Sequence, residues 1–135
     1  MSPKVSVIVP LWNSAATIGA TLESLRQQTL EDWEAIVIDD GSTDGGPALA
    51  RRIGDEDSRV RVVSQANAGL SAARNAGLAL TQGEFVHFLD ADDSLPPDAL
   101  ASLVVAASKG DGASYGAFAW VEPSAASAPF VVEIP

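Results

Sequence analysis

The sequence contains no cysteine, a single histidine and few cationic side chains. Without cysteine, disulfides, thiolate metal sites and cysteine nucleophiles are excluded. The one histidine, His87, lies inside the apolar run Phe85–Leu89, which favours a packing role over membership of a catalytic triad. No segment approaches the roughly 20 apolar residues that cross a bilayer, and the N-terminus lacks the pattern of a secretory signal. We therefore expect a cytoplasmic protein.

Acidic residues outnumber basic ones by 18 to 8, which gives a formal net charge of −10. Such a surface repels nucleic-acid phosphates and anionic lipid headgroups, so nucleic-acid binding and electrostatic membrane attachment are both disfavoured. A phosphate ligand can still bind through a divalent cation or through backbone amides. The charge therefore disfavours these macromolecular partners without excluding a small phosphorylated ligand.

The 135 residues, of which 47% are apolar and 19% charged, suit one globular domain. Short β-branched runs alternate with stretches of helical spacing, which predicts an α/β fold with a mainly parallel sheet flanked by helices. Strands are predicted at Val5–Val9, Ala35–Ile38, Val60–Val63, Phe85–Leu89 and Ser114–Val121. Helices are predicted over Ala15–Gln28 with Ser14 as its cap, from Pro47 to about Ile53 with Gly54 closing it, over Leu70–Leu80, and from Pro96 and Pro97 to about Ser108.

The end of the chain differs in composition from the rest. From Glu122 onward it is rich in proline, alanine and serine, and its apolar run Phe130–Ile134 has no evident partner. We therefore expect one domain over residues 1–121. Residues 122–135 are then a tail or the start of a further segment.

Polar clusters follow each of the first four predicted strands, where ligands bind in parallel α/β sheets. The most acidic cluster is Asp90-Ala91-Asp92-Asp93. Strand alternation places Asp90 and Asp92 on roughly the same side, and hard oxygen ligands suit Mg²⁺ or Mn²⁺. The alternative is an acidic turn in which Asp93 or Ser94 caps the next helix.

Two other clusters suit a nucleotide. Asp39 and Asp40, before the glycine at 41, could accept hydrogen bonds from a base or a ribose, although the same residues also make an ordinary turn. The stretch Asn67–Asn75 runs into a helix whose first amides favour a pyrophosphate. Arg74 could contact that anion or pair with an acidic loop. A packing role is favoured for Trp12, although at the end of a strand it could line a pocket.

Together these pieces resemble the large inverting glycosyltransferase family 2, whose fold is GT-A, a Rossmann-like architecture. The order and spacing of the motifs fit over about residues 4–121, and four motifs in sequence are far more specific than any one of them. The matching stretches are Val5–Asn13, Ile36–Asp44, Asn67–Gly77 and Phe88–Asp93.

The resemblance implies a nucleotide-sugar site. Pro10 and Leu11 would shape the base pocket, and Asp40, or less directly Asp39, would contact the base, commonly uracil. Arg74 would lie near the diphosphate or the acidic motif. The implied donor-binding set is Pro10, Leu11, Asn13, Asp39, Asp40, Asn67, Gly69, Arg74 and Asp90, while Asp92, with Asp90, would hold a Mn²⁺ or Mg²⁺ ion that bridges the diphosphate.

Inverting transfer also needs a general base that deprotonates the acceptor hydroxyl. Family members usually continue into an acceptor-binding segment that carries it. Here the acidic residues past Asp98 are Asp111, Glu122 and Glu133, and none sits in such a motif. We expect a donor domain truncated before that segment, with little transfer activity alone. The expected donor is a UDP-sugar, and a glycan or lipid-linked acceptor at the inner face of the membrane would suit the family.

Two other classes remain open. A nucleotidyltransferase has a similar sheet and acidic site, but it generally presents a glycine-rich basic loop after the first strand. The sequence there is Leu11-Trp12-Asn13-Ser14, with no cation. A non-catalytic nucleotide- or sugar-binding module of the same fold would share every donor-site residue and lack the base.

Overall fold

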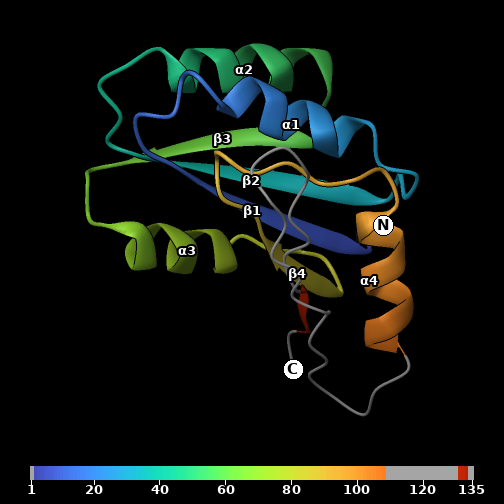
Figure 1. Cartoon of the computed structure of the whole chain (residues 1–135). Coiled ribbons are helices and arrows are strands. Elements are labelled where there is room, and N and C mark those ends of the chain that lie inside the picture. Colours follow the sequence, from blue (N-terminus) through green and yellow to red (C-terminus); the bar gives the residue numbers. More distant parts are fainter. Residues whose placement is uncertain (1, 109–130, 134–135) are drawn as a thin grey trace.

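The computed structural model describes residues 2–108 and 131–133, and these form a sheet with helices on both of its faces (Figure 1). The strand order is β3-β2-β1-β4-β5, in which the first four strands are parallel and β5 is antiparallel to β4. The strands are β1 (Val5–Leu11), β2 (Trp33–Asp40), β3 (Val60–Gln65), β4 (Phe85–Phe88) and β5 (Val131–Glu133). The helices are α1 (Ile18–Arg26), α2 (Gly46–Glu56), α3 (Leu70–Leu78) and α4 (Ala99–Ser108). The predicted α/β fold with a mainly parallel sheet is confirmed.

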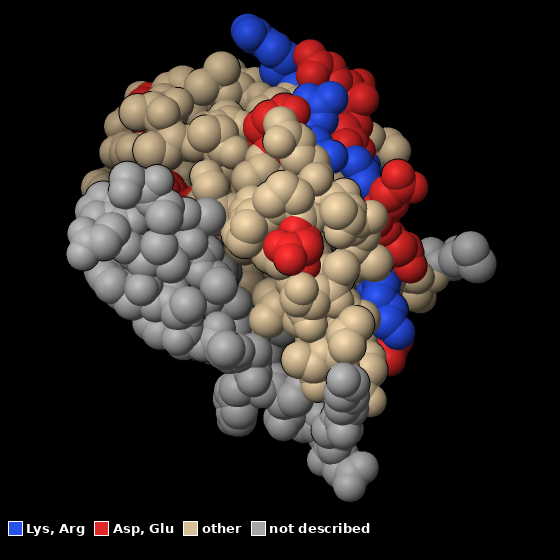
Figure 2. Space-filling model, turned by 45° about the vertical axis from the view of Figure 1, so that its right-hand side comes forward, with Lys and Arg blue, Asp and Glu red and all other residues tan. Residues whose placement is uncertain are grey.

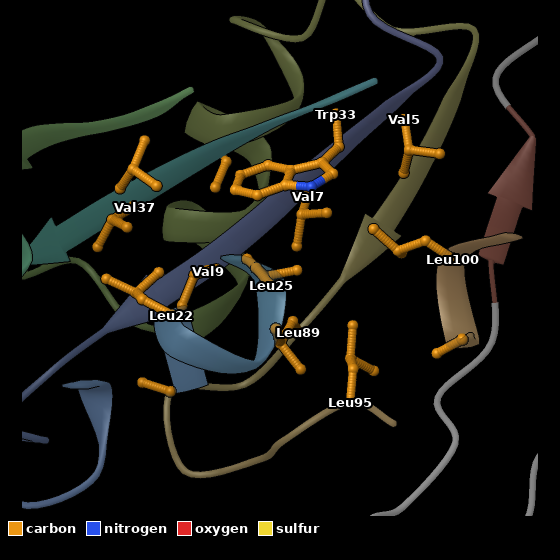
Figure 3. Packing of buried hydrophobic residues seen from close by; sticks show 14 of the residues in the cluster. Val5, Val7, Val9, Leu22, Leu25, Trp33, Val37, Leu89, Leu95 and Leu100 are labelled. Carbon is orange, nitrogen blue, oxygen red and sulfur yellow. The ribbon is translucent and has the colours of Figure 1, made fainter. Parts of the chain in front are cut away.

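The main core lies between the sheet and the helices α1, α2 and α4. Alternate residues of β1, from Val5 to Leu11, face this side and are fully buried, as are Leu22 and Leu25 of α1 and Leu100 of α4 (Figure 3). Burying an aliphatic side chain of this size contributes about 1.5–3 kcal/mol. These side chains therefore fix the sheet beneath the loops that follow its strands.

The opposite face of the sheet is covered by α3 alone among the described helices (Figure 1). Ile36 and Ile38 of β2 pack against Ala73 of α3. Gly77 lets the helix approach closely, because a Cβ atom there would lie 2.5 Å from the Cγ2 atom of Ile8. Small residues in α3 thus set its distance from the sheet.

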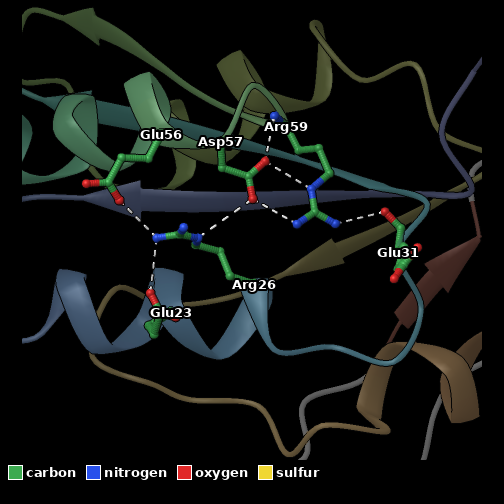
Figure 4. A network of polar contacts seen from close by, with 6 residues as sticks. All are labelled: Glu23, Arg26, Glu31, Glu56, Asp57 and Arg59. Atoms are coloured by element: carbon green, nitrogen blue, oxygen red, sulfur yellow. Dashed lines mark hydrogen bonds and ion pairs between the residues drawn. The ribbon is translucent and has the colours of Figure 1, made fainter.

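At the amino ends of the strands, charged side chains form a paired network (Figure 4). Arg59 donates to both carboxylate oxygens of Asp57, at 3.0 and 2.8 Å, and stacks 3.9 Å from the ring centroid of Trp33. Arg26 adds ion pairs to Glu56, at 3.2 Å, and to Asp57, at 3.7 Å. On the face shown in Figure 2, cationic and anionic side chains likewise lie side by side in one band.

The structure corrects the prediction for the end of the chain. The run Phe130–Ile134 was expected to lack a partner, but Val131–Glu133 pairs with β4, with His87 opposite Val131. That pairing joins segments far apart in the sequence, so no local pattern indicates it. The predicted strand Ser114–Val121 lies outside the described residues.

Helix starts and ends differ from the predicted ones by a few residues. Ser14 does not cap α1 with its side chain, because its hydroxyl donates to the Trp12 carbonyl at 3.0 Å while α1 begins at Ile18. The helix α2 continues through Gly54, where a Cβ atom would lie 2.8 Å from the Val60 carbonyl oxygen. No helix in the described part of the chain is both long and apolar enough to cross a membrane.

Candidate functional site

A cleft of about 480 Å³ lies beyond the carboxyl ends of the parallel strands. The loops after β1, β3 and β4, the last residue of β2 and the start of α3 meet there, which is where ligands bind in open α/β sheets. The residues that line it are Pro10, Leu11, Trp12, Ser14, Asp40, Asn67, Gly69, Leu70, Ala73, Asp90, Ala91 and Asp92.

One wall of the cleft is the acidic cluster, defined as Asp90, Asp92 and Asp93. One carboxylate oxygen from each of the three lies within 4.8 Å of the others. The pKa of Asp93 is raised, first by burial and then by the negative charges of Asp92 and Asp90. The described residues therefore do not fully compensate the mutual repulsion of these carboxylates. Three hard oxygen ligands at this spacing fit Mg²⁺ or Mn²⁺.

The backbone of the acidic cluster is held in place from two directions. The amide of Asp93 donates to the carbonyl of Asp90 at 3.0 Å, and the buried hydroxyl of Thr21 donates to the carbonyl of Ala91 at 2.8 Å. The alternative role for Asp93 or Ser94, as a helix cap, is wrong, because α4 begins only at Ala99. The cluster is a fixed turn rather than the start of a helix.

Arg74 of α3 reaches this turn. Its Nη2 atom lies 3.3 Å from Oδ1 of Asp90, and its guanidinium lies 5.9 Å from the ring centroid of Phe88. Among residues 2–108 this is the only ion pair that involves the acidic cluster. Arg74 thus lies beside the acidic motif without lining the cleft itself.

Asp40 lines the cleft but is already engaged by the segment before α3. Its carboxylate accepts hydrogen bonds from Nε2 of Gln65 and from the amides of Ala68 and Gly69, each at 2.9 Å. The hydrogen bond from Gln65 and then that from Ala68 lower the pKa of Asp40. The expectation that the amides entering α3 are free for a pyrophosphate is therefore wrong for Ala68 and Gly69.

Asp39 and Asn13 lie behind the cleft and join its loops. Asp39 is buried and accepts hydrogen bonds from the amide of Ser42 at 2.9 Å and the hydroxyl of Ser64 at 3.1 Å. Asn13, at a positive φ of 47°, accepts a hydrogen bond from the amide of Thr43 at 2.7 Å. These contacts hold the loop after β1 against the loop after β2.

The predicted site residues thus divide into two groups. Those that line the cleft are Pro10, Leu11, Asp40, Asn67, Gly69, Asp90 and Asp92, and those that lie outside its lining are Asn13, Asp39 and Arg74. Trp12, for which packing was favoured over a place in a pocket, lines the cleft and is 57% exposed, so the favoured packing role is wrong. Sequence reasoning missed Ser14, Leu70, Ala73 and Ala91. The sequence does not indicate that Leu70 lines a cleft, because an apolar residue in a helical pattern is usually expected to pack. In the structure Leu70 is 53% exposed at the first turn of α3.

The charge of the cleft constrains its ligand. Its described lining carries three carboxylates, on Asp40, Asp90 and Asp92, and neither lysine nor arginine. An anionic ligand would be repelled from such a surface unless a cation came with it. This arrangement therefore suits a cation together with its anionic partner.

A parallel α/β sheet with an acidic cleft at its carboxyl edge defines a class of nucleotide-binding α/β proteins. Comparison with known proteins is more specific, because the family described as Glycosyl transferase family 2 matches residues 6–128. The chain belongs to this family.

Individual relatives agree with that assignment. The chain is 42% identical over 97 residues to the putative glycosyltransferase EpsH of Bacillus subtilis, covering 72% of the chain and 28% of EpsH. It matches S. aureus TarS 1-349 in complex with UDP-GlcNAc with a TM-score of 0.70 and 32% identity, over 78% of the chain and 31% of TarS 1-349. It also matches the mannosyltransferase PcManGT of Pyrobaculum calidifontis, in complex with GDP-Man and Mn²⁺, with a TM-score of 0.73 and 30% identity, over 84% of the chain and 34% of that protein. The chain thus spans about a third or less of the length of these relatives.

Proposed function

We propose that the cleft binds a nucleotide-diphosphate sugar, in the first place a UDP-sugar, together with a divalent cation, for inverting transfer of the sugar to an acceptor hydroxyl. The observation that carries the proposal is the lining of the cleft, with three carboxylates and no lysine or arginine among the described residues. A cation that neutralises a diphosphate would offset its repulsion from such a surface. The acidic cluster offers the oxygen ligands for that cation.

The residues of the cleft suit the parts of such a donor. Pro10, Leu11 and the exposed ring of Trp12 offer an apolar wall for the base. Asp40 keeps acceptor capacity beyond its three internal hydrogen bonds, because an ionised carboxylate accepts about four. It can therefore contact the base, and nearby Asn67 completes that side.

At the other end of the cleft, Asp92, with Asp90, would hold Mn²⁺ or Mg²⁺, and Asp90 would also face the ribose or the sugar. A divalent cation there would stabilise negative charge on the departing nucleoside diphosphate. Arg74 lies beside this end through its ion pair with Asp90. Asn13, Asp39 and Gly69 shape the loops rather than contact the cation.

The relatives support a nucleotide-sugar donor while differing in its base. TarS 1-349 is in complex with UDP-GlcNAc, whereas PcManGT is in complex with GDP-Man and Mn²⁺. Uracil is the base that we propose for this chain, and guanine is the alternative that a binding experiment must include.

We expect the 135-residue chain to bind its donor and to transfer little sugar, because no candidate general base follows Asp98 in a recognisable motif. The second candidate function, a non-catalytic nucleotide-binding module, shares the donor site. Rapid sugar transfer or donor hydrolysis by the purified chain would contradict both the expected low activity and this second candidate.

The test is calorimetric titration of the chain with UDP and with GDP, once in Mn²⁺ and once in EDTA. We expect UDP to bind in Mn²⁺ only, and Asp92→Ala to weaken that binding by about 100-fold or more. Asp55→Ala, which removes an exposed carboxylate from α2, is the matched control and should bind UDP like the unmodified chain. Binding of UDP that is equally tight in EDTA would contradict the proposed role of the cation.

A further inference from the structure

Arg74 stands in an unusual electrostatic position. It is the one cationic side chain among residues 2–108 that is paired with the acidic cluster, through the 3.3 Å contact with Oδ1 of Asp90. This oxygen belongs to a residue that also lines the cleft. The guanidinium of Arg74 and a cation in the cleft would therefore compete for the carboxylate of Asp90.

The contact between Arg74 and Asp90 is a replaceable one. The two side chains are 38% and 50% exposed, so solvent screens the pair, and such pairs are weak. The Nε atom of Arg74 is buried and makes no hydrogen bond to any described residue. At the other edge of the sheet, by contrast, Arg59 donates hydrogen bonds from all three of its guanidinium nitrogens. Arg74 is held by fewer contacts than Arg59.

We propose that Arg74 is an internal counter-ion of the acidic cluster: it holds Asp90 when no divalent cation is bound, and it opposes cation binding until Asp90 is released. This inference rests on the cation site proposed above. It assigns Arg74 a positioning role that acts through Asp90, rather than direct contact with the cation.

The consequence is a coupling between the cation and the nucleotide. By holding Asp90, Arg74 weakens binding of a cation alone, and a diphosphate that arrives with the cation offers the guanidinium another anion, so that Asp90 is released. Because coupling between two ligands is reciprocal, the nucleotide tightens cation binding and the cation tightens nucleotide binding. Arg74 thereby favours joint binding over a cation-only complex.

The experiment measures binding of Mn²⁺ alone to the 135-residue chain, from the electron paramagnetic resonance signal of free Mn²⁺. We expect Arg74→Gln to bind Mn²⁺ about three- to tenfold more tightly than the unmodified chain at low salt, with a smaller gain at high salt. Arg74→Lys keeps the charge and should stay within about twofold of the unmodified chain. Arg52→Gln removes the same charge from α2, on the other face of the sheet from α3, and is the matched control (Figure 1).

A second background tests whether the effect passes through Asp90. In Asp90→Asn the gain from Arg74→Gln should shrink to less than about twofold, because the shared carboxylate is gone. An Arg74→Gln variant that binds Mn²⁺ equally or less tightly overturns the inference, as does a gain that persists in full in Asp90→Asn. Failure of the unmodified chain and every variant to bind Mn²⁺ would instead overturn the cation site itself.

Discussion

The two edges of the sheet differ in how their carboxylates are paired with cationic side chains. At the amino edge, Asp57 is bound by Arg59 through both oxygens and approached by Arg26. At the carboxyl edge, the three aspartates of the acidic cluster share a single ion pair among residues 2–108, that of Arg74 with Asp90. Asp57 at the first edge is thus neutralised by its arginines, and the acidic cluster at the second edge leaves negative charge for a ligand to neutralise.

The pKa shifts of Asp57 and of the acidic cluster show the same difference. At the amino edge, the hydrogen bond and the charge of Arg59 lower the pKa of Asp57. At the carboxyl edge, burial and the neighbouring carboxylates raise the pKa of Asp93. A lowered carboxyl pKa marks a group that stabilises the fold in its charged form, whereas a raised one marks a group whose charge the fold opposes. Substitutions at the two edges should therefore have opposite consequences.

The largest contrast is expected from the Asp92→Ala variant introduced above. Its loss of UDP binding should come without loss of stability, because Asp92 is exposed and its removal relieves repulsion. We expect its free energy of unfolding in urea to stay within about 0.5 kcal/mol of the unmodified chain, or to rise. A clear fall in stability would mean that the acidic cluster is structural, like the amino edge.

Asp40→Asn tests a carboxylate that both holds the loop before α3 and lines the nucleotide cleft. An amide cannot accept the hydrogen bonds of Gln65, Ala68 and Gly69 as a carboxylate does, so the loop before α3 should loosen. We expect UDP and GDP to lose affinity in parallel, by about tenfold, with faster hydrogen exchange at Ala68 and Gly69. Loss of UDP affinity alone, with unchanged exchange, would show that Asp40 acts through the base only.

Asp57→Asn tests the amino edge. Loss of the paired charge should lower the free energy of unfolding by about 1–2 kcal/mol, because Asp57 is largely buried and bound at two points. Nucleotide affinity should not change, since no atom of this network lines the cleft. Urea unfolding and a parallel UDP titration measure the two quantities, and weaker UDP binding would contradict the separation of the two edges.

The pH dependence of stability should follow Asp57 as well. Its pKa is lower in the folded chain than the unfolded value of about 3.9, so its contribution is complete above that value. The contribution is lost as the pH falls through the folded pKa. The unmodified chain should therefore lose more stability than Asp57→Asn between neutral pH and acid, as urea midpoints would show. Parallel curves for the two proteins would exclude this role.

The smallest effect is expected at Asp93. The raised pKa of Asp93 means that its surroundings disfavour the charged form. Asp93→Asn should therefore stabilise the folded chain at neutral pH by about 0.5 kcal/mol. Thermal unfolding without divalent cations would measure this gain. A loss of stability would show that the fold stabilises the charged form of Asp93.

Much of this arrangement is local and could be predicted. Nearly continuous apolar runs mark the strands, and the position of the acidic clusters after them follows directly. The alternation of side chains along a strand then assigns each residue to one face of the sheet. The same alternation could have separated the adjacent aspartates. Asp40 falls on the face of Ile36 and Ile38, which α3 covers, whereas Asp39 falls on the face of Val37.

The rest depends on contacts between distant segments. The pairing of Val131–Glu133 with β4 and the capture of Asp40 by the segment before α3 join residues at least 25 positions apart. Neither contact is indicated by a periodic pattern or by the composition of the segments that form it. The exposure of Leu70 has the same origin, because it depends on where α3 meets the rim of the cleft.

The anchoring of Asp40 also bears on how donor preference can evolve or be redesigned. A residue that holds three hydrogen bonds of the scaffold cannot be exchanged for a new specificity without loosening the loop that carries Asn67 and Gly69. Trp12 and Leu70 can be exchanged with less effect on the scaffold, since both line the cleft and more than half of each is exposed. Variation in the choice of nucleotide should therefore accumulate at these two positions, while Asp40 stays fixed.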